Sequence, residues 1–188
     1  MPLPASSARK ELHTRQITCT GYQRDDGLLD VEARLTDVKT YPFENAYRGT
    51  IHPDDPIHDM WIRITVDEKL IIHDCIAVTD KSPFGCCPDI TPTFKRLIGE
   101  QIAAGWTMRV KKLVGGLQGC THLTDLLGPA TTTIFQTMSG IRKGRGSNET
   151  AKPFYINGCH AWAADSEQVG YSGLYTGNII SNSLSTAQ

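Results

Sequence analysis

The first half of the chain alternates between apolar and polar residues, the pattern of β-strands. Within residues 29–41, apolar side chains stand at every second position from Leu29 to Leu35, with acidic, basic or hydroxyl side chains between them. A period of two places alternate side chains on opposite faces of a strand, so we expect one buried and one wet face. A less regular alternation begins at Glu11, and Asp25-Asp26-Gly27 predicts a hairpin turn between the two segments.

A second hairpin is predicted from two segments that are rich in β-branched residues. Residues 60–66 and 70–79 form these segments, and Asp67-Glu68-Lys69 joins them. The intervening residues 42–56 contain several prolines and are expected to form a loop of a length that is often functional.

Helical spacing of apolar residues follows in two later segments. A helix is predicted over residues 93–104, where Phe94, Leu97, Ile98 and Ile102 share one face. Residues 106–114 are predicted as a further strand that runs into a glycine turn. After this turn, apolar residues repeat at helical spacing through residue 138, with a bend or restart expected at Gly128-Pro129. Together these elements predict an α+β fold, an antiparallel sheet with helices packed on one face.

The composition of the 188 residues predicts one domain with extensions at both ends. We expect a disordered lead over residues 1–10 and the α+β domain over 11–140. A Gly, Ser, Asn and Thr rich linker over 141–151 is then expected to lead to a partly disordered C-terminal appendage, 152–188. The appendage is expected to pack on the domain or on a second subunit, so a homodimer is one expected assembly.

Charge and hydropathy narrow the classes of partner. The chain has 19 basic and 20 acidic residues, which gives no broad basic surface for a nucleic acid. No apolar run has the length of a membrane span or of a signal-peptide core, so we expect a cytoplasmic protein without membrane contact. The six cysteines, with Cys86 and Cys87 adjacent, are expected to be reduced thiols.

Residues 115–123 carry the most site-like chemistry. A glycine turn delivers Cys120 and His122 to the first turn of a predicted helix, where unpaired N–H groups favour an anion such as a thiolate. A thiolate and an imidazole two residues apart suit either a soft metal ion or a nucleophile with its base. The structural alternative is that Cys120 is a small buried hydrophobe and His122 a polar residue at a helix start.

Three stretches together offer a set of metal ligands. Ile57-His58-Asp59, Gly85-Cys86-Cys87 and Gly119-Cys120-Thr121-His122 each stand at the end of a strand or the start of a helix. Thiolates, imidazoles and a carboxylate are the ligands of zinc or iron, so we expect one such ion. The candidate ligands are His58, Asp59, Cys86, Cys120 and His122.

His13 and Arg15 are candidates for substrate binding. They lie two residues apart on a predicted strand and so face one side, where Arg15 could bind a substrate carboxylate through its planar fork. The alternative is an outward-facing cationic strand face.

The order of these features resembles the iron–sulfur cluster assembly scaffold family. That family runs from Cys-Gly-Asp through a Val-Asp-Glu turn and a Gly-Cys loop to a His-Cys pair. The corresponding segments here, within roughly residues 55–138, are Ile57-His58-Asp59, Val66-Asp67-Glu68, Gly85-Cys86 and Gly119-Cys120. The resemblance implies a scaffold-like fold. Because Ile57 replaces the first cysteine, a mononuclear ion is expected rather than a cluster.

The whole chain more closely resembles a bacterial family known only as a domain of unknown function. Its hallmarks are His13-Thr14-Arg15, Gly21-Tyr22 through Asp26-Gly27, residues 35–39, His58-Asp59-Met60 and Gly119-Cys120-Thr121-His122-Leu123. This resemblance implies no activity.

The residues favour a small metal-dependent enzyme of lyase or hydrolase type, acting on a small carboxylated or aromatic molecule. His13, Arg15 and His122 are its candidate catalytic residues. A non-catalytic carrier or scaffold for a metal or an iron–sulfur cluster is one alternative. A metal-free enzyme with Cys120 as nucleophile and His122 as base is another.

Overall fold

The computed structural model describes residues 3–144, 156–167 and 169, and the chain divides into two compact units, residues 1–141 and 142–188. The strands are β1 (His13–Gln23), β2 (Leu29–Lys39), β3 (Phe43–Asn45), β4 (Gly49–Ile51), β5 (His58–Val66) and β6 (Ile72–Lys81). The helices are the 3-10 helices η1 (Cys87–Leu97), η2 (Gly116–Gln118) and η3 (His160–Trp162) and the α-helices α1 (Trp106–Val114) and α2 (Thr121–Gly144).

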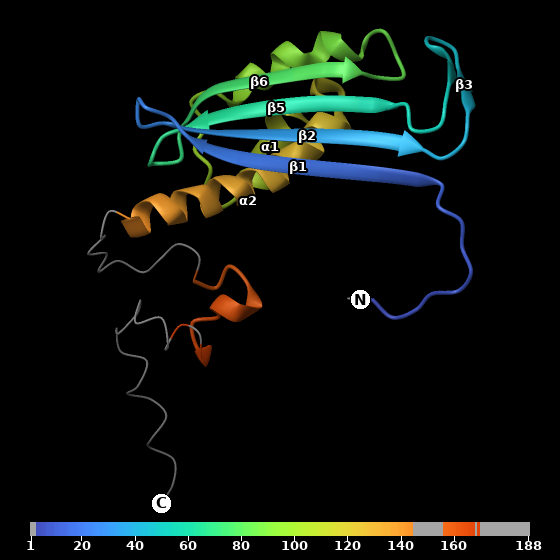
Figure 1. Ribbon diagram of the computed structural model, residues 1–188. Coiled ribbons are helices and arrows are strands. Elements are labelled where there is room, and N and C mark those ends of the chain that lie inside the picture. The colour runs from blue at the N-terminus through green and yellow to red at the C-terminus, as the bar shows by residue number, and fades with distance from the viewer. Residues whose placement is uncertain (1–2, 145–155, 168, 170–188) are drawn as a thin grey trace, which may run out of the picture. The chain divides into compact units, whose positions relative to one another are not determined.

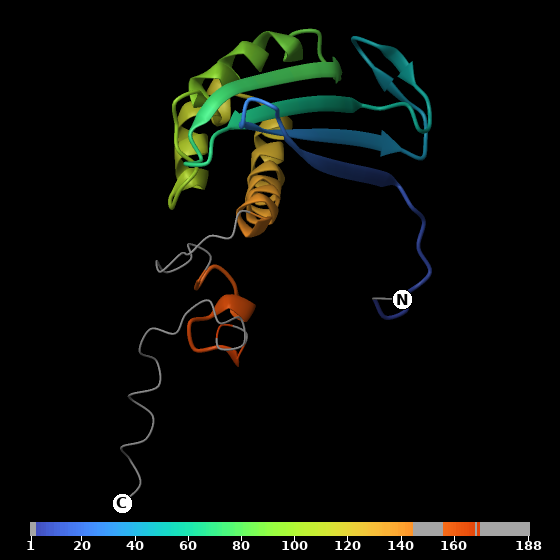
Figure 2. The ribbon, with the colours of Figure 1, turned by 60° about the vertical axis from the view of Figure 1, so that its left-hand side comes forward.

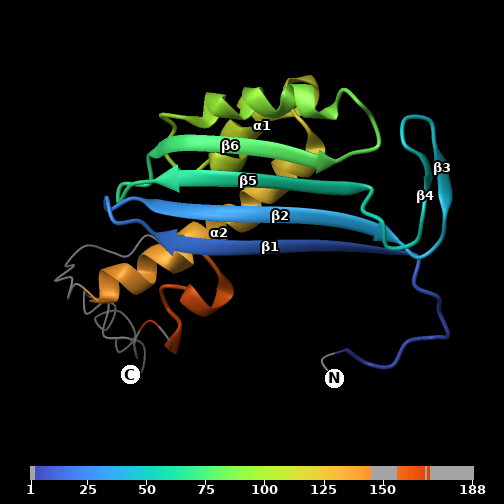
Figure 3. The same cartoon turned by 45° about the horizontal axis from the view of Figure 1, so that its top comes forward.

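Four strands form an antiparallel sheet in the order β1-β2-β5-β6, and β3 and β4 form a separate two-stranded hairpin. Figures 1 and 3 show the four long strands side by side, with the small hairpin beyond one end of the sheet. The prediction of an α+β fold with an antiparallel sheet is confirmed. The likeness to iron–sulfur scaffolds stays a prediction.

The core lies between one face of the sheet and the helices. Figure 2 shows α1 and α2 on the same side of the sheet. The sheet contributes every second residue of β2 and β5, and the helices contribute residues at helical spacing. The core includes Leu29, Val31, Ala33, Leu35, Met60, Ile62, Ile64 and Val66 from the sheet and Phe94, Val110, Val114, Leu123, Leu126, Leu127, Ala130 and Ile134 from the helices.

Both predicted hairpins are present. The first turn uses Gly27 at a φ of 88°, a conformation that glycine adopts without steric cost. In the second turn, the Asp67 side chain accepts hydrogen bonds from the backbone N–H groups of Lys69 and Ile71, each at 2.9 Å. The turn residues that join the strands of each hairpin could therefore be recognised in the sequence.

Residues 106–114 form the helix α1, so the prediction of a strand there is wrong. Trp106, Val110 and Val114 are the buried residues of this segment, and they lie four residues apart, on one helix face. Helix α2 runs without interruption through Pro129, where a bend or restart was expected.

The helix predicted over residues 93–104 is displaced and of a different type. The 3-10 helix η1 covers Cys87–Leu97. Gly99, at a φ of 85°, follows it, and the Ile102 N–H donates to the Leu70 carbonyl at 2.9 Å in an extended segment. Phe94, Leu97 and Ile102 are buried as expected, but Ile98 is exposed.

The remaining boundaries differ in smaller ways. The loop predicted over residues 42–56 contains the β3–β4 hairpin. Helix α2 continues to Gly144, into the segment 141–151 that was predicted as a linker, and 145–151 lie outside the described residues. Most of the predicted appendage, 152–188, also lies outside them, as do residues 1–2 of the predicted disordered lead. In the part of the chain that the structure describes, no helix is both long and apolar enough to cross a membrane.

Candidate functional site

Polar side chains occupy one end of the sheet face that packs against the helices. The buried positions of β2 continue from Leu35 to Asp37, so a carboxylate occupies the next core-facing position. The strand register places Arg15 of β1 and His58 of β5 on either side of Asp37. Alternation and pairing together therefore bring three polar side chains from three strands to one point of the core edge.

Asp37 accepts hydrogen bonds from three side chains. Arg15 donates to it through Nε, at 2.8 Å to Oδ1, and through Nη2, at 2.9 Å to Oδ2. The His13 Nε2 lies 3.0 Å from Oδ1, and the His58 Nδ1 lies 2.9 Å from Oδ2. The Asp37 side chain is only 2% exposed. Burial alone would raise the pKa of Asp37, but Arg15 and His58 outweigh it and the pKa is lowered, so the carboxylate is ionised.

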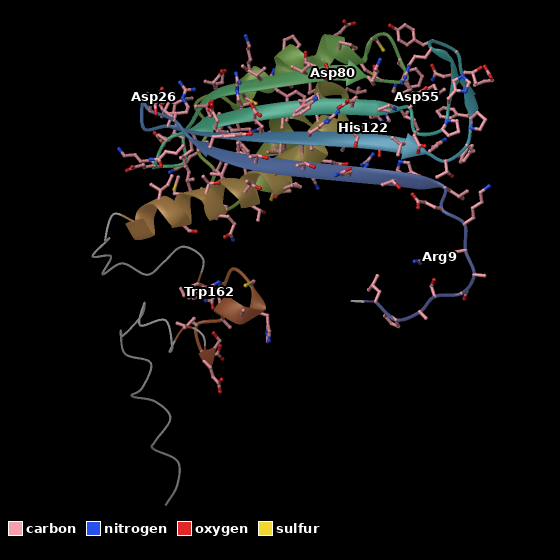
Figure 4. All side chains as sticks on the ribbon, in the orientation of Figure 1. Arg9, Asp26, Asp55, Asp80, His122 and Trp162 are labelled. Carbon is pink, nitrogen blue, oxygen red and sulfur yellow. The ribbon has the colours of Figure 1, made fainter. Side chains whose placement is uncertain are left out.

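The start of α2 completes the site from the helix layer. A side chain at Gly119 could not be accommodated, because its Cβ would lie 1.8 Å from the Val114 carbonyl oxygen. Beyond Gly119, the first turn of α2 carries His122, whose ring stacks on that of His58 with centroids 3.7 Å apart. The Cys120 Sγ lies 3.8 Å from the His122 Nδ1. Figure 4 labels His122 among the side chains of the domain.

Both stacked imidazoles favour the neutral state. Burial is the main cause that lowers the pKa of His58, and the neighbouring His122 lowers it further. Burial also lowers the pKa of His122, with Arg15 as the next cause. A neutral imidazole keeps one nitrogen lone pair, which is the form that binds a metal ion or accepts a proton.

The charged side chains around Asp37 carry a net negative charge. Asp125 of α2 lies at their exposed side, with its Oδ2 3.1 Å from the Arg15 Nη1. Arg15 contributes +1 and the carboxylates of Asp37 and Asp125 contribute −1 each, so with neutral His58 and His122 these five residues sum to −1. This charge favours a cation over an anionic ligand. The Arg15 guanidinium donates to both of these carboxylates. Its role as a fork for a substrate carboxylate stays a prediction.

Three of these side chains can hold a metal ion. Asp37, His58 and His122 each offer a ligand atom, and these atoms all lie within 4.8 Å of one another. Two imidazoles and a carboxylate suit zinc, and with open positions they suit ferrous iron. The stacked rings and the buried carboxylate therefore form a candidate metal centre.

The structure brings together most of the residues singled out in the sequence. Five of them contact one another around Asp37 and Asp125: His13, Arg15, His58, Cys120 and His122. We call these seven residues the Asp37 cluster.

Asp59 and Cys86 are not part of the cluster. Asp59 follows His58 directly and points to the opposite face of the sheet, where Arg34 binds it at 2.9 and 2.7 Å. Cys86 is exposed and precedes η1. Neither residue belongs to the group of converging ligand atoms.

Sequence reasoning missed Asp37 and Asp125. The signal for Asp37 was present, because the alternation that begins at Leu29 reaches Asp37 when it is extended by one step beyond Leu35. No local signal identified Asp125, whose partner Arg15 lies 110 residues earlier in the chain.

One of three comparisons with known proteins found a match. A family model described as "Protein of unknown function (DUF2889)" matches residues 13–136, the span from the first residue of β1 into α2. Searches of curated proteins and of solved structures found no match to the chain.

Proposed function

The chain belongs to this family of proteins of unknown function, whose matched span contains every residue of the Asp37 cluster, and we propose that it is a metal-dependent enzyme. The observation that carries the proposal is the convergence of Asp37, His58 and His122, whose ligand atoms lie within 4.8 Å of one another. These residues come from two strands and a helix, so the whole fold is needed to assemble them.

The proposed ion is zinc or iron, bound by two imidazole nitrogens and one carboxylate oxygen. Such a set leaves coordination positions for water and substrate, as in catalytic rather than structural sites. Bound there, the ion would lower the pKa of a water molecule and polarise a substrate oxygen, which suits hydrolase or lyase chemistry.

The charges of the cluster support a cation. Without an ion, two carboxylates face one guanidinium, and burial keeps His58 and His122 neutral. Arg15 offsets part of the charge of Asp37 and holds its carboxylate in place. His13, whose side chain is 44% exposed, stands on the solvent side of Asp37 as a candidate acid or base toward a substrate.

Metal titration tests this proposal. Protein purified without an affinity tag is stripped with a chelator and titrated with Zn²⁺ against a competing indicator. The wild type is expected to bind one ion, and His58→Ala and His122→Ala are each expected to weaken binding by at least about 100-fold, since each removes a ligand. His73→Ala is the matched control, because His73 is exposed and pairs with Asp67 outside the cluster. Equal affinity in all four proteins would contradict the proposal.

A metal-free nucleophilic enzyme is the second candidate. The Cys120 Sγ lies 3.8 Å from the His122 Nδ1, an arrangement in which the imidazole could take the thiol proton. In metal-free protein, this reading expects iodoacetamide to label Cys120 fastest and His122→Gln to slow that labelling. Cys75 is the internal control, because burial raises the pKa of its thiol to about 12.

An iron–sulfur scaffold has less support. Among the described residues, Cys120 is the one cysteine of the cluster, and Cys86 does not join it. The cytoplasmic location and the homodimer stay predictions.

A further inference from the structure

Lys39 lies on the same face of the sheet as the candidate metal centre. It stands two residues beyond Asp37 on β2, and alternate residues of a strand share a face. Its register partner on β1 is His13, which reaches Asp37 on that face. Two residues along a strand cover about 6.6 Å. The face that carries the metal ligands therefore continues, over the length of a small molecule, to Lys39.

The pairing with His13 brings the two side chains close together. The Thr40 N–H donates to the Leu12 carbonyl at 3.3 Å. Hydrogen-bonded and non-hydrogen-bonded pairs alternate along an antiparallel ladder, so the next pair, Lys39 and His13, is non-hydrogen-bonded. Side chains lie closer in such pairs, whose Cα atoms are about 4.5 Å apart. His13 is thus a direct neighbour of Lys39 and also lies 3.0 Å, through its Nε2, from the Asp37 Oδ1.

Two aromatic rings hold the Lys39 ammonium at the end of β2. Its Nζ lies 4.2 Å from the ring centroid of Phe43 and 5.2 Å from that of Tyr41. Phe43 begins β3, and Figure 3 shows the β3–β4 hairpin beyond the end of the sheet at which β2 ends. A ring face attracts a cation but does not neutralise it. The ammonium is therefore held in place and keeps its charge.

The backbone of Lys39 is fixed together with that of the metal centre. The Asp54 N–H donates to the Lys39 carbonyl at 3.0 Å, and the Ile57 N–H donates to the Asp37 carbonyl at 2.8 Å. The segment that leads into His58 is therefore hydrogen-bonded to β2 at both residues. Groups on such a fixed frame can bind two ends of one ligand precisely.

Lys39 is a cation without a carboxylate partner. It forms none of the ion pairs found among the described residues, and its side chain is partly exposed. Arg15, in contrast, donates to both Asp37 and Asp125. Lys39 and Arg15, these two carboxylates and a bound Zn²⁺ ion sum to +2. Once the ion is bound, the charge of this region favours an anionic substrate.

We propose that Lys39 binds the carboxylate of the substrate, whose reacting oxygen lies on the metal ion. The substrate class is a small carboxylate with a second oxygen-bearing group, an ester, hydroxyl or carbonyl, a few carbon atoms away. The ammonium would donate charge-assisted hydrogen bonds to the carboxylate, while Phe43 and Tyr41 keep it in position. This assignment rests on the proposed function, because the ion holds the other end of the substrate.

Three hydroxamates test the carboxylate contact on Zn²⁺-loaded protein. Each binds zinc through its hydroxamate oxygens. Acetohydroxamate has no carboxylate, whereas the monohydroxamates of succinate and glutarate carry one at the other end. In calorimetric titrations, the wild type is expected to bind at least one of these two about tenfold more tightly than acetohydroxamate, the gain of a charge-assisted contact. Equal affinities for all three would overturn the proposal.

Lys39→Met removes the charge and keeps a long, unbranched side chain. The variant is expected to lose the tenfold preference and to bind acetohydroxamate as the wild type does. Lys112→Met is the matched control, because Lys112 is an exposed lysine in the last turn of α1, and it is expected to keep the preference. A preference that persists in Lys39→Met, or that disappears in Lys112→Met as well, would overturn the proposal.

A purely structural role of Lys39 gives a different result. If the ammonium only held Phe43 and Tyr41 at the end of β2, Lys39→Met would weaken the binding of all three hydroxamates alike. Lys39→Arg would then restore none of the carboxylate preference. The proposal expects Lys39→Arg to restore part of it, because a guanidinium also binds carboxylates and stacks on rings. A uniform loss of affinity in Lys39→Met would show a structural role and overturn the proposal.

Zn²⁺ binding is measured first in every variant, which separates two kinds of failure. Lys39→Met is expected to bind Zn²⁺ as the wild type does, since Lys39 is not one of the three converging ligands. If Zn²⁺ binds and the preference is absent, the assignment of Lys39 fails and the proposed function stands. If the wild type does not bind Zn²⁺, the proposed function fails, and the substrate assignment is overturned with it.

Discussion

The two faces of the sheet each hold a buried aspartate, and the two are built differently. Asp37, on the helix-covered face, is bound by Arg15, His13 and His58. Asp59, on the open face, is bound in a bidentate manner by Arg34. The exposed fractions of the two residues are similar, 2% for Asp37 and 8% for Asp59.

The surroundings of Asp59 are those of a structural ion pair. Its partner Arg34 also stacks on Trp61, with the guanidinium carbon 4.7 Å from the ring centroid. The pair of one carboxylate and one guanidinium is neutral, the Asp80 carboxylate acts on Arg34 more weakly, and the stacked arginine is held on both sides.

The surroundings of Asp37 leave negative charge and imidazole lone pairs in excess. Its two stacked imidazoles are neutral, and Asp125 adds a second carboxylate. A neutral ion pair supports the fold, whereas a charged cluster with convergent imidazole nitrogens can bind a ligand. Burial of a carboxylate is therefore a weaker sign of function than the balance of the groups around it.

The largest expected effect is that of Asp37→Asn. The change removes the negative charge that pairs with Arg15 and is expected to lower the free energy of unfolding by about 2–3 kcal/mol. Arg15 is 36% exposed and can be partly solvated, which keeps the loss at the low end for a broken buried pair. Urea unfolding at pH 7 measures the change, and Zn²⁺ affinity should fall with it. A stable variant with unchanged Zn²⁺ affinity would remove the contrast between the two aspartates.

Asp59→Asn is the matched variant on the open face, with a smaller expected cost of about 1 kcal/mol. Arg34 is 43% exposed and can turn to water when its partner is neutralised. The same unfolding experiment measures the cost, and Zn²⁺ affinity is expected to stay unchanged. Loss of the ion in this variant would return Asp59 to the list of ligands.

The pH dependence of stability sharpens the comparison further. In metal-free protein, the pKa values of His58 and His122 are lowered below 6.5, so the unfolded chain binds more protons as the pH falls below 6.5. Stability is therefore expected to be full above pH 6.5 and to decline as the pH falls from there through the lowered pKa values. Urea midpoints between pH 8 and pH 5 measure this decline.

His122→Gln should make the decline shallower, because one of the two titrating groups is removed. Asp59→Asn should leave its slope unchanged. An identical slope in wild type and His122→Gln would show that the stacked pair does not cause it.

The smallest expected effect is that of Cys86→Ser. Cys86 is exposed and lies outside the Asp37 cluster, so stability and Zn²⁺ affinity are both expected to stay at wild-type values. Calorimetric unfolding and Zn²⁺ titration check both. A weaker affinity in this variant would support the scaffold-like ligand set in place of the cluster.

Most of the sheet could be predicted from the sequence, because its signals are local. Alternation defines β2. Asp25-Asp26-Gly27 defines the turn between β1 and β2, and Asp67-Glu68-Lys69 defines the turn between β5 and β6. The sequence did not distinguish a helix from a strand at α1, because this nine-residue segment, with Trp106, Val110 and Val114, also has the residue types of a strand. The core contacts of these three residues decide in favour of the helix.

The site was predictable only in part. The residue types of His58, Cys120 and His122 identified them, but their convergence depends on a strand and a helix that are far apart in the sequence. The same period of two that predicted the strands separates His58 from Asp59, because neighbouring strand residues face opposite sides. Extending that period along β2 would have selected Asp37 in place of Asp59.

X-ray absorption at the zinc edge of the Zn²⁺-loaded protein tests the central claim most directly, because it reports the ligand atoms themselves. The account predicts a first shell of nitrogen and oxygen near 2.0–2.2 Å with the outer-shell pattern of two imidazoles. It predicts no sulfur, since Asp37, His58 and His122 hold the ion. A sulfur shell near 2.3 Å would place a cysteine on the metal and contradict the account.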